Sequence, residues 1–133
     1  MNPMPRILVV EDELAMRTVL RDCLERHGYR VLIASDGHAG LVKATQEKPD
    51  LILLDVIMPT MDGGDVAGRI QQDKTLRGTP VIFLTATVSQ SEAGAKGLNS
   101  GGALFLAKPI SVENLVQHIK QNLRPEPEAE NPT

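Results

Sequence analysis

The chain has 133 residues, 41% of them hydrophobic, which is long enough for one buried core and too short for two ordinary domains. Its 14 lysines and arginines against 17 aspartates and glutamates give a formal net charge of -3, which argues against a surface built to bind nucleic acid. The single cysteine, Cys23, excludes an intrachain disulfide and a cysteine-rich zinc site.

Two kinds of short segment alternate along the chain. Continuous runs of Val, Ile and Leu indicate parallel strands buried on both faces, and apolar residues spaced three and four apart indicate amphipathic helices. In chain order, the alternating predicted strands and helices lie at 7–10, 14–27, 31–34, 38–47, 51–54, 65–72, 81–84, 89–100, 104–107 and 112–123. This alternation predicts a five-stranded, doubly wound α/β domain with right-handed crossovers.

The predicted helices differ in the strength of their end signals. Gly28 is a C-terminal stop for the first helix, and Ser111 is a good N-cap for the last one. The segment 89–100 is the weakest helix, because it contains Gly94 and Gly97, and each interior glycine costs roughly 1 kcal/mol relative to alanine. We expect this segment to be mobile.

The last ten residues, RPEPEAENPT, differ in composition from the rest of the chain. Proline and glutamate dominate, and little apolar surface is available for packing. We therefore predict a domain over 1–123, followed at 124–133 by a flexible, acidic, proline-rich tail or linker.

Two further exclusions concern location and ligands. No run of about 18 apolar residues occurs, and the N-terminal MNPMPR lacks the apolar region of a signal peptide, so we expect a cytoplasmic protein with no membrane contact. The absence of tryptophan and the presence of one tyrosine and two phenylalanines argue against a base-stacking surface for single-stranded nucleic acid.

Polar residues follow the apolar strand segments at the ends where ligands bind in open parallel sheets. They are Glu11, Asp12 and Glu13 after the first strand, Asp55 after the third, Thr85 after the fourth and Lys108 after the fifth. Three carboxylates in one crevice repel each other unless a cation is bound, and oxygen ligands of this kind suit Mg²⁺. One carboxylate could then attack phosphorus to form an acyl phosphate, with a lysine charge and a hydroxyl beside it.

Four spaced motifs make a resemblance specific. The segments ILVVEDE (7–13), LLDVIMPTMDG (53–63), PVIFLTA (80–86) and FLAKP (105–109) resemble the receiver domains of two-component response regulators, the chemotaxis response regulators among them. The resemblance implies a flavodoxin-like (βα)5 fold with strand order 2-1-3-4-5. It also implies that Asp55 is the phosphoacceptor, and that Mg²⁺ is bound by Glu11, Asp12, Asp55 and the backbone carbonyl of Ile57.

The same resemblance assigns the residues that respond to the phosphoryl group. Thr85 is the switch hydroxyl, Lys108 binds the phosphate, and Phe105 is the rotating aromatic residue. Glu11 stands where the family more often has aspartate, and Phe105 lacks the hydroxyl that many relatives carry.

The implied partners are a sensor histidine kinase or histidine phosphotransfer protein, and a downstream protein that contacts the surface of the fourth helix, fifth strand and fifth helix. We expect no direct contact with nucleic acid, a phosphorylation-dependent homodimer as one form of output, and no catalysis beyond the domain's own phosphorylation and slow autodephosphorylation.

Two other functions remain open at this point. One is a receiver-like docking module that is never phosphorylated, although all of its acid, hydroxyl and lysine positions are filled. The other is an aspartyl-nucleophile phosphohydrolase, but that class has a second aspartate two residues after the nucleophile, where this chain has Ile57. Considered singly, each polar residue also has an ordinary explanation, such as acids favouring the N-terminus of a helix.

Overall fold

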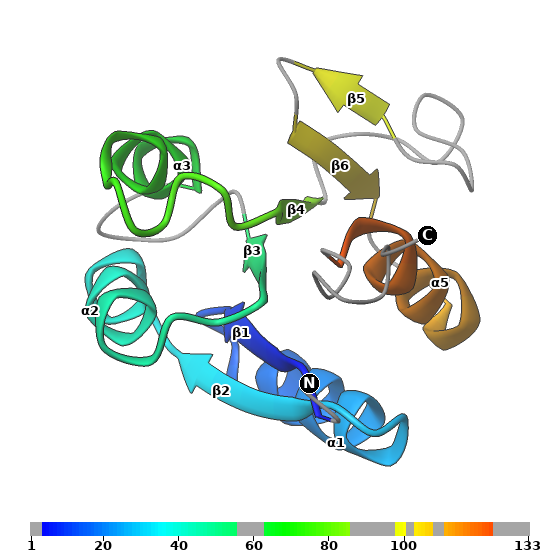
Figure 1. Ribbon diagram of the computed structural model, residues 1–133. Helices are drawn as coiled ribbons and strands as arrows, with labels where there is room; N and C mark the ends of the chain where they lie inside the picture. The colour runs from blue at the N-terminus through cyan, green and yellow to red at the C-terminus, as the bar shows by residue number, and fades with distance from the viewer. Residues whose placement is uncertain (1–3, 56–62, 86–97, 101–102, 108–110, 124–133) are drawn as a thin grey trace, which may run out of the picture.

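The computed structural model describes residues 4–55, 63–85, 98–100, 103–107 and 111–123. Their strands form one sheet in the order β2-β1-β3-β4-β6-β5 (Figure 1). The strands are β1 (Arg6–Val10), β2 (Arg30–Ala34), β3 (Leu51–Asp55), β4 (Val81–Thr85), β5 (Leu98–Ser100) and β6 (Ala103–Ala107). All neighbouring strands are parallel except β5, which is antiparallel to β6.

This topology confirms the predicted α/β fold class. The five predicted strands correspond to β1, β2, β3, β4 and β6, and their order across the sheet is the expected 2-1-3-4-5. The short edge strand β5 was not predicted. Residues 98–100 were assigned to the end of the fourth helix, and this was wrong because they pair with β6 instead. Residues 89–97 of that predicted helix lie outside the described part of the chain.

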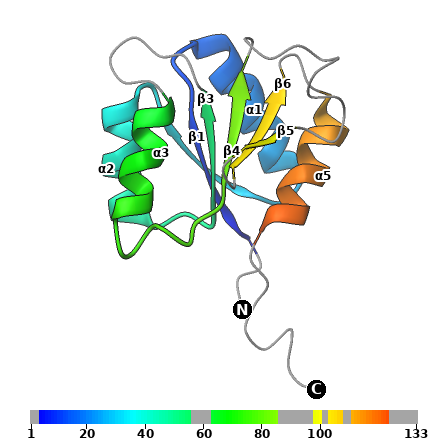
Figure 2. The same cartoon turned by 90° about the horizontal axis from the view of Figure 1, so that it is seen from above.

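The helices lie in two layers around the sheet (Figure 2). Helices α2 (Gly37–Glu47) and α3 (Gly63–Gln72) cover one face, while α1 (Leu14–Arg26) and α5 (Val112–Asn122) cover the other. Successive residues of β1 point to opposite faces, so Ile7 and Val9 join the core cluster beneath α1 and α5, whereas Leu8 and Val10 join the one beneath α2 and α3. This double burial explains why the strand sequences are continuously apolar.

The structure contains the two helix ends predicted at Ser111 and Gly28, and a further N-cap at Asp36. The Ser111 hydroxyl accepts a hydrogen bond from the backbone N–H of Asn114 at 3.1 Å, and Asp36 caps α2 in the same way through the N–H of Ala39 at 2.8 Å. Gly28 follows α1 with φ of 90°, a conformation that glycine adopts without a steric penalty. Among the described residues, no helix has both the length and the apolar composition to cross a membrane.

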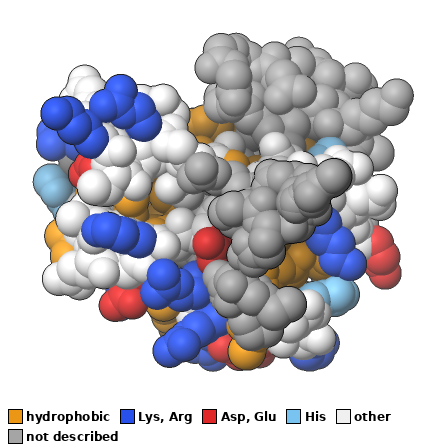
Figure 3. Space-filling model, viewed as in Figure 1, with side chains coloured by type: hydrophobic (Ala, Val, Ile, Leu, Met, Phe, Trp, Pro, Cys, Tyr) orange, Lys and Arg blue, Asp and Glu red, His pale blue; other side chains and the backbone are white. Residues whose placement is uncertain are grey.

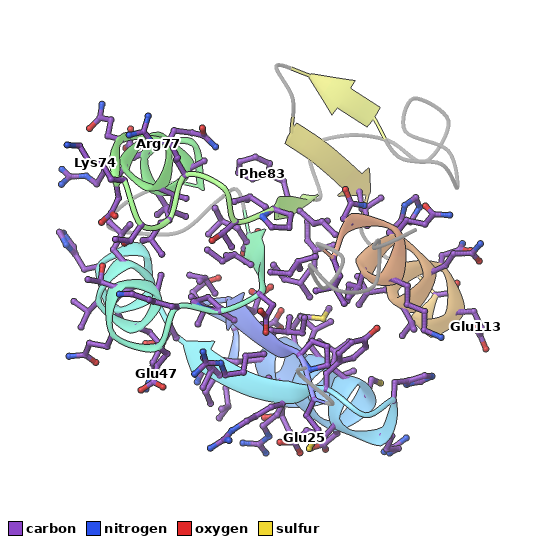
Figure 4. The ribbon with its side chains drawn as sticks, viewed as in Figure 1. Glu25, Glu47, Lys74, Arg77, Phe83 and Glu113 are labelled. Atoms are coloured by element: carbon purple, nitrogen blue, oxygen red, sulfur yellow. The ribbon has the colours of Figure 1, made fainter. Side chains whose placement is uncertain are left out.

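Side-chain placement across the sheet is illustrated by Phe83, which projects from β4 into the cluster shared with α2 and α3 (Figure 4). Helix α2 approaches the sheet closely at Gly40, where an added Cβ atom would lie 2.8 Å from Val10 Cγ2. Val10 is the last residue of β1, so this close approach lies directly before Glu11.

Candidate functional site

Three carboxylates meet at the carboxyl end of the sheet. Strands β1 and β3 are parallel neighbours with Val10 opposite Leu54, so Asp55 at the end of β3 lies beside the chain that leaves β1. One carboxylate oxygen from each of Glu11, Asp12 and Asp55 lies within 4.8 Å of the others. The structure thus gathers three of the acids that the sequence singled out, and we call them the acid cluster.

The members of the acid cluster differ in exposure. Glu11 is 2% exposed and Asp55 is 8% exposed, whereas Asp12 is open to solvent. Burying carboxylates side by side is costly unless hydrogen bonds or a cation offset their charge. An arrangement of two buried acids and one accessible acid could hold a divalent cation with one side open to water, as Mg²⁺ prefers.

Glu11 is held by its backbone and by its side chain. Its N–H donates to the carbonyl of Ala34 at 3.0 Å, continuing the β1–β2 pairing by one residue. Its Oε2 accepts a hydrogen bond from the N–H of Glu13 at 3.2 Å. These contacts fix the carboxylate at the sheet end, close to the N-terminus of α1, where negative charge is favoured.

The ordinary explanation of the acidic run, that it caps α1, accounts for only part of it. Glu13 occupies the N-cap position, and its side chain makes no capping hydrogen bond. Asp12 and Asp55 contribute to the acid cluster from the loop and from a separate strand. Helix capping therefore does not explain why three acids converge.

Arg17 on α1 contacts the loop that carries two of the acids, and sequence reasoning did not single it out. Its Nη1 donates to the carbonyl of Glu11 at 2.9 Å and lies 3.4 Å from the carbonyl of Asp12. The available signal was an arginine one turn into a helix that follows an acidic pair. That pattern alone is equally typical of a solvated arginine.

Of the remaining predicted site residues, two lie in described strands and two lie outside the described part of the chain. Thr85 ends β4 opposite Ala107 of β6, and β4 adjoins β3, so its backbone lies at the same end of the sheet as Asp55. Phe105 lies in β6 opposite Phe83. Ile57 and Lys108 lie outside the described residues.

The charges visible on one face of the molecule are mixed in sign (Figure 3). Basic side chains gather over α3 and the turn after it, where Lys74 and Arg77 lie (Figure 4). In this view no single sign covers the whole face, in keeping with the small net charge of -3.

Comparison with known proteins gives one consistent family. The family model described as the response regulator receiver domain matches residues 7–120. A relative in Synechocystis, the DNA-binding dual master transcriptional regulator RpaA, is 38% identical over 121 residues, which are 91% of this chain and 50% of that protein. The chain spans about half the length of the curated relatives that it matches first.

Solved structures agree. The chemotaxis protein CheY4 of Vibrio cholerae has a TM-score of 0.78 and 30% identity, over 90% of this chain and 99% of that one. The receiver domain of the sensor histidine kinase PA1611 from Pseudomonas aeruginosa, with a magnesium ion coordinated in its active site cleft, has a TM-score of 0.76 and 30% identity, over 90% and 97% of the two chains.

These relatives correct the predicted partners. The prediction excluded direct contact with nucleic acid, and it was wrong to do so, because RpaA is named as a DNA-binding regulator. The exclusion rested on the net charge and aromatic content of these 133 residues. Those quantities describe only the matched half of such a relative and carry no information on what the other half binds.

Proposed function

The chain belongs to the family of response regulator receiver domains, which serve two-component signalling, and from this premise we propose that Asp55 accepts a phosphoryl group from a partner histidine kinase or histidine phosphotransfer protein while Mg²⁺ is bound beside it. The observation that carries the proposal is the acid cluster. One carboxylate oxygen of the buried Asp55 lies within 4.8 Å of a carboxylate oxygen of Glu11 and of one of Asp12. A purely structural aspartate at the end of a strand would not require two further carboxylates beside it.

The acid cluster fits a magnesium ion in the chemistry of its donors. Glu11, Asp12 and Asp55 offer carboxylate oxygens, and the backbone carbonyl of Ile57 is the fourth proposed ligand. When bound, Mg²⁺ supplies positive charge that offsets the acids and the incoming phosphoryl oxygens. The magnesium ion in the active site cleft of the PA1611 receiver supports the choice of metal.

In the proposed reaction, a carboxylate oxygen of Asp55 forms a bond to phosphorus as the phosphorus–nitrogen bond of the donor phosphohistidine breaks. The electron pair of that bond stays on the imidazole, which takes up a proton. Asp55 attacks as the carboxylate. Asp55 is the last residue of β3, at the carboxyl end of the sheet, where ligands bind in open parallel sheets.

The readout of the phosphoryl group is assigned to three residues. Lys108 pairs with the phosphoryl charge, the Thr85 hydroxyl donates a hydrogen bond to a phosphoryl oxygen, and Phe105 moves with Thr85. The position of Thr85 on the strand next to Asp55 supports its role. The domain itself catalyses only its own phosphorylation and the slow loss of the phosphoryl group.

The test is incubation with Mg²⁺ and acetyl phosphate, followed by intact mass, and with a beryllofluoride mimic, followed by NMR. We expect a gain of one phosphoryl group in the wild type and none in Asp55→Asn or with EDTA. Asp22→Asn, which alters an exposed aspartate on α1, is the matched control and should react as the wild type does. No Asp55-dependent gain would overturn the proposal, and continuous phosphate release from phosphate esters would favour the phosphohydrolase instead.

For the full-length protein we propose transcriptional control as the output, through a DNA-binding region outside the receiver. The support is the printed name of RpaA and the half-length match. A mobility-shift assay of the full-length protein with genomic DNA fragments tests this. No retardation of any fragment, with or without acetyl phosphate, would contradict it.

A further inference from the structure

The loop between β1 and α1 consists of only three residues, and two of them belong to the acid cluster. Glu11 is buried and held by hydrogen bonds to Ala34 and Glu13, but Asp12 is exposed. An exposed carboxylate loses side-chain freedom when it binds a metal, and it also loses backbone freedom unless its backbone is already fixed. Contacts that fix the backbone of Asp12 should therefore increase the affinity of the acid cluster for a metal ion.

Arg17 contacts both peptide groups that flank the Cα atom of Asp12. The carbonyl of Glu11 belongs to the peptide before that atom, and the carbonyl of Asp12 belongs to the peptide after it. Arg17 Nη1 lies 2.9 Å from the first oxygen and 3.4 Å from the second. Because each peptide group is planar, holding both of them restrains φ and ψ of Asp12 and so the direction of its side chain.

The backbone of Arg17 is anchored in α1. Arg17 lies in the first turn of α1, where its N–H donates to the carbonyl of Glu13 at 2.9 Å, and its side chain is half-buried. A charged donor makes a stronger hydrogen bond to a carbonyl than a neutral donor does, and the planar group keeps its N–H directions fixed. Helix α1 thus acts as a rigid support for the metal-binding loop.

The positive charge of Arg17 should lower the affinity for Mg²⁺, whereas its contacts with the loop should raise it. A cation near three carboxylates reduces their attraction for Mg²⁺, so removing it would tighten binding if charge were the dominant influence. The two effects predict opposite signs. They also differ in salt dependence, because salt screens the charge effect and leaves the loop geometry unchanged.

We propose that Arg17 is a positioning residue for the metal site, raising the affinity for Mg²⁺ by holding the backbone of Asp12 in its ligand geometry. This inference rests on the proposed function, in which the acid cluster binds Mg²⁺. Arg17 touches neither the ion nor the phosphoryl group.

The experiment is a Mg²⁺ titration of the intact chain, followed by the amide NMR signals of the β1–α1 loop. Arg17→Ala should raise the dissociation constant about tenfold, the scale observed for residues that orient metal ligands. Arg17→Lys keeps the charge and loses the planar guanidinium. Its dissociation constant should lie between those of the wild type and Arg17→Ala. The ratio of variant to wild type should be the same at low and high salt.

The matched controls are Arg21→Ala and Arg21→Lys. Arg21 lies one turn further along α1, and its Nε lies 3.6 Å from the carboxylate of Asp22 at the surface. Its variants should bind Mg²⁺ as the wild type does, because an exposed ion pair of this kind contributes little. Thermal unfolding in EDTA reports whether each variant is folded before metal is added.

Each outcome decides between the two claims. Equal affinity in Arg17→Ala and the wild type, or tighter binding that disappears at high salt, overturns the role of Arg17 alone. Unfolding of both Arg17 variants in EDTA also overturns it, since the residue would then serve the fold. No saturable Mg²⁺ binding by the wild type, or undiminished binding by Asp12→Asn, overturns the metal site and this inference together.

Discussion

Adjacent residues of one loop have different surroundings in this protein. Glu11 is almost fully buried and bonded to the backbone of β2 and of the α1 N-terminus, while Asp12 is accessible and its carbonyl faces Arg17. Glu11 is therefore fixed in place, whereas the Asp12 carboxylate is accessible to water and to an ion that the acid cluster could hold.

The burial of Tyr29 predicts a raised pKa for its phenol. It is 5% exposed, and burial raises the pKa of its phenol above the ordinary 10.0. As the only tyrosine in a chain without tryptophan, it can be titrated by ultraviolet absorbance without interference. We expect a midpoint above that of the denatured chain.

The sign of the linked stability follows from this shift. The folded state binds the phenolic proton more tightly, so the contribution is complete below the unfolded pKa and is lost as the pH rises through the folded pKa. Tyr29→Phe should remove this component of the alkaline loss of stability. A phenol that titrates at or below its denatured midpoint would contradict the prediction.

At the scale of elements, the packing of α2 against β1 depends on a glycine. Gly40 leaves no room for a side chain, because an added Cβ atom would approach Val10 Cγ2 to 2.8 Å and Cγ1 to 3.1 Å. Valine is stiff at χ1 and cannot turn away easily. Helix α2 would have to move from the strand that leads into Glu11.

We therefore expect Gly40→Ala to lower the free energy of unfolding by about 1 to 3 kcal/mol, measured by urea denaturation. Gly68→Ala on α3 is the matched control, since nothing lies within 4 Å of its added Cβ atom. It should instead raise the free energy of unfolding by about 0.5 to 1 kcal/mol, because alanine favours the helix. Equal effects of the two changes would refute the steric explanation, as would additivity of Gly40→Ala with Val10→Ala.

The edge of the sheet shows an element that periodicity could not reveal. Residues 98–100 are too few for a strand signal, and they end the glycine-containing segment 89–100, which was predicted as a helix because strands and helices alternate along the chain. Their strand exists because β6 offers an unpaired edge to an antiparallel partner. Because this pairing depends on a strand that is close in space, the periodicity of the segment itself does not predict it.

For the molecule as a whole, the proposed metal site should couple binding to stability. A ligand that binds only the folded state adds about 2.7 kcal/mol to the free energy of unfolding at a hundred times its dissociation constant. Mg²⁺ should therefore raise the melting temperature of the wild type and of Asp22→Asn, and leave Asp12→Asn unchanged. The rise should shrink in acid, because the ligands must be deprotonated. An equal rise in Asp12→Asn would place the ion elsewhere.

We also propose that the domain ends at residue 123, with 124–133 as a separate tail. Helix α5 ends at Asn122, and Leu123 packs partly buried against the core cluster of α1 and α5. Removal of 124–133 should leave the urea midpoint unchanged, whereas removal of 123–133 should lower it because a core contact is lost. A large loss from the shorter truncation would show that the tail belongs to the fold.

Local sequence patterns were sufficient to predict every described helix and all strands except β5, because burial imposes a periodic pattern of apolar residues on each segment. Continuous apolar runs predicted five strands that the structure contains, and Ser111 and Gly28 predicted the ends of two helices. Polar residues directly after those runs identified the acids worth comparing. The motif spacing was sufficient to indicate the receiver family that the matched domain confirms.

The contacts of those residues depend on how the segments pack in three dimensions. Asp55 reaches Glu11 because β3 pairs with β1, Gly40 meets Val10 across α2 and the sheet, and Arg17 turns back onto the acidic loop. Each contact joins residues whose spacing in the chain does not specify it. Burial acts on one segment at a time and so leaves a periodic signal, whereas strand order and side-chain contacts arise from pairing between segments, which no local pattern records.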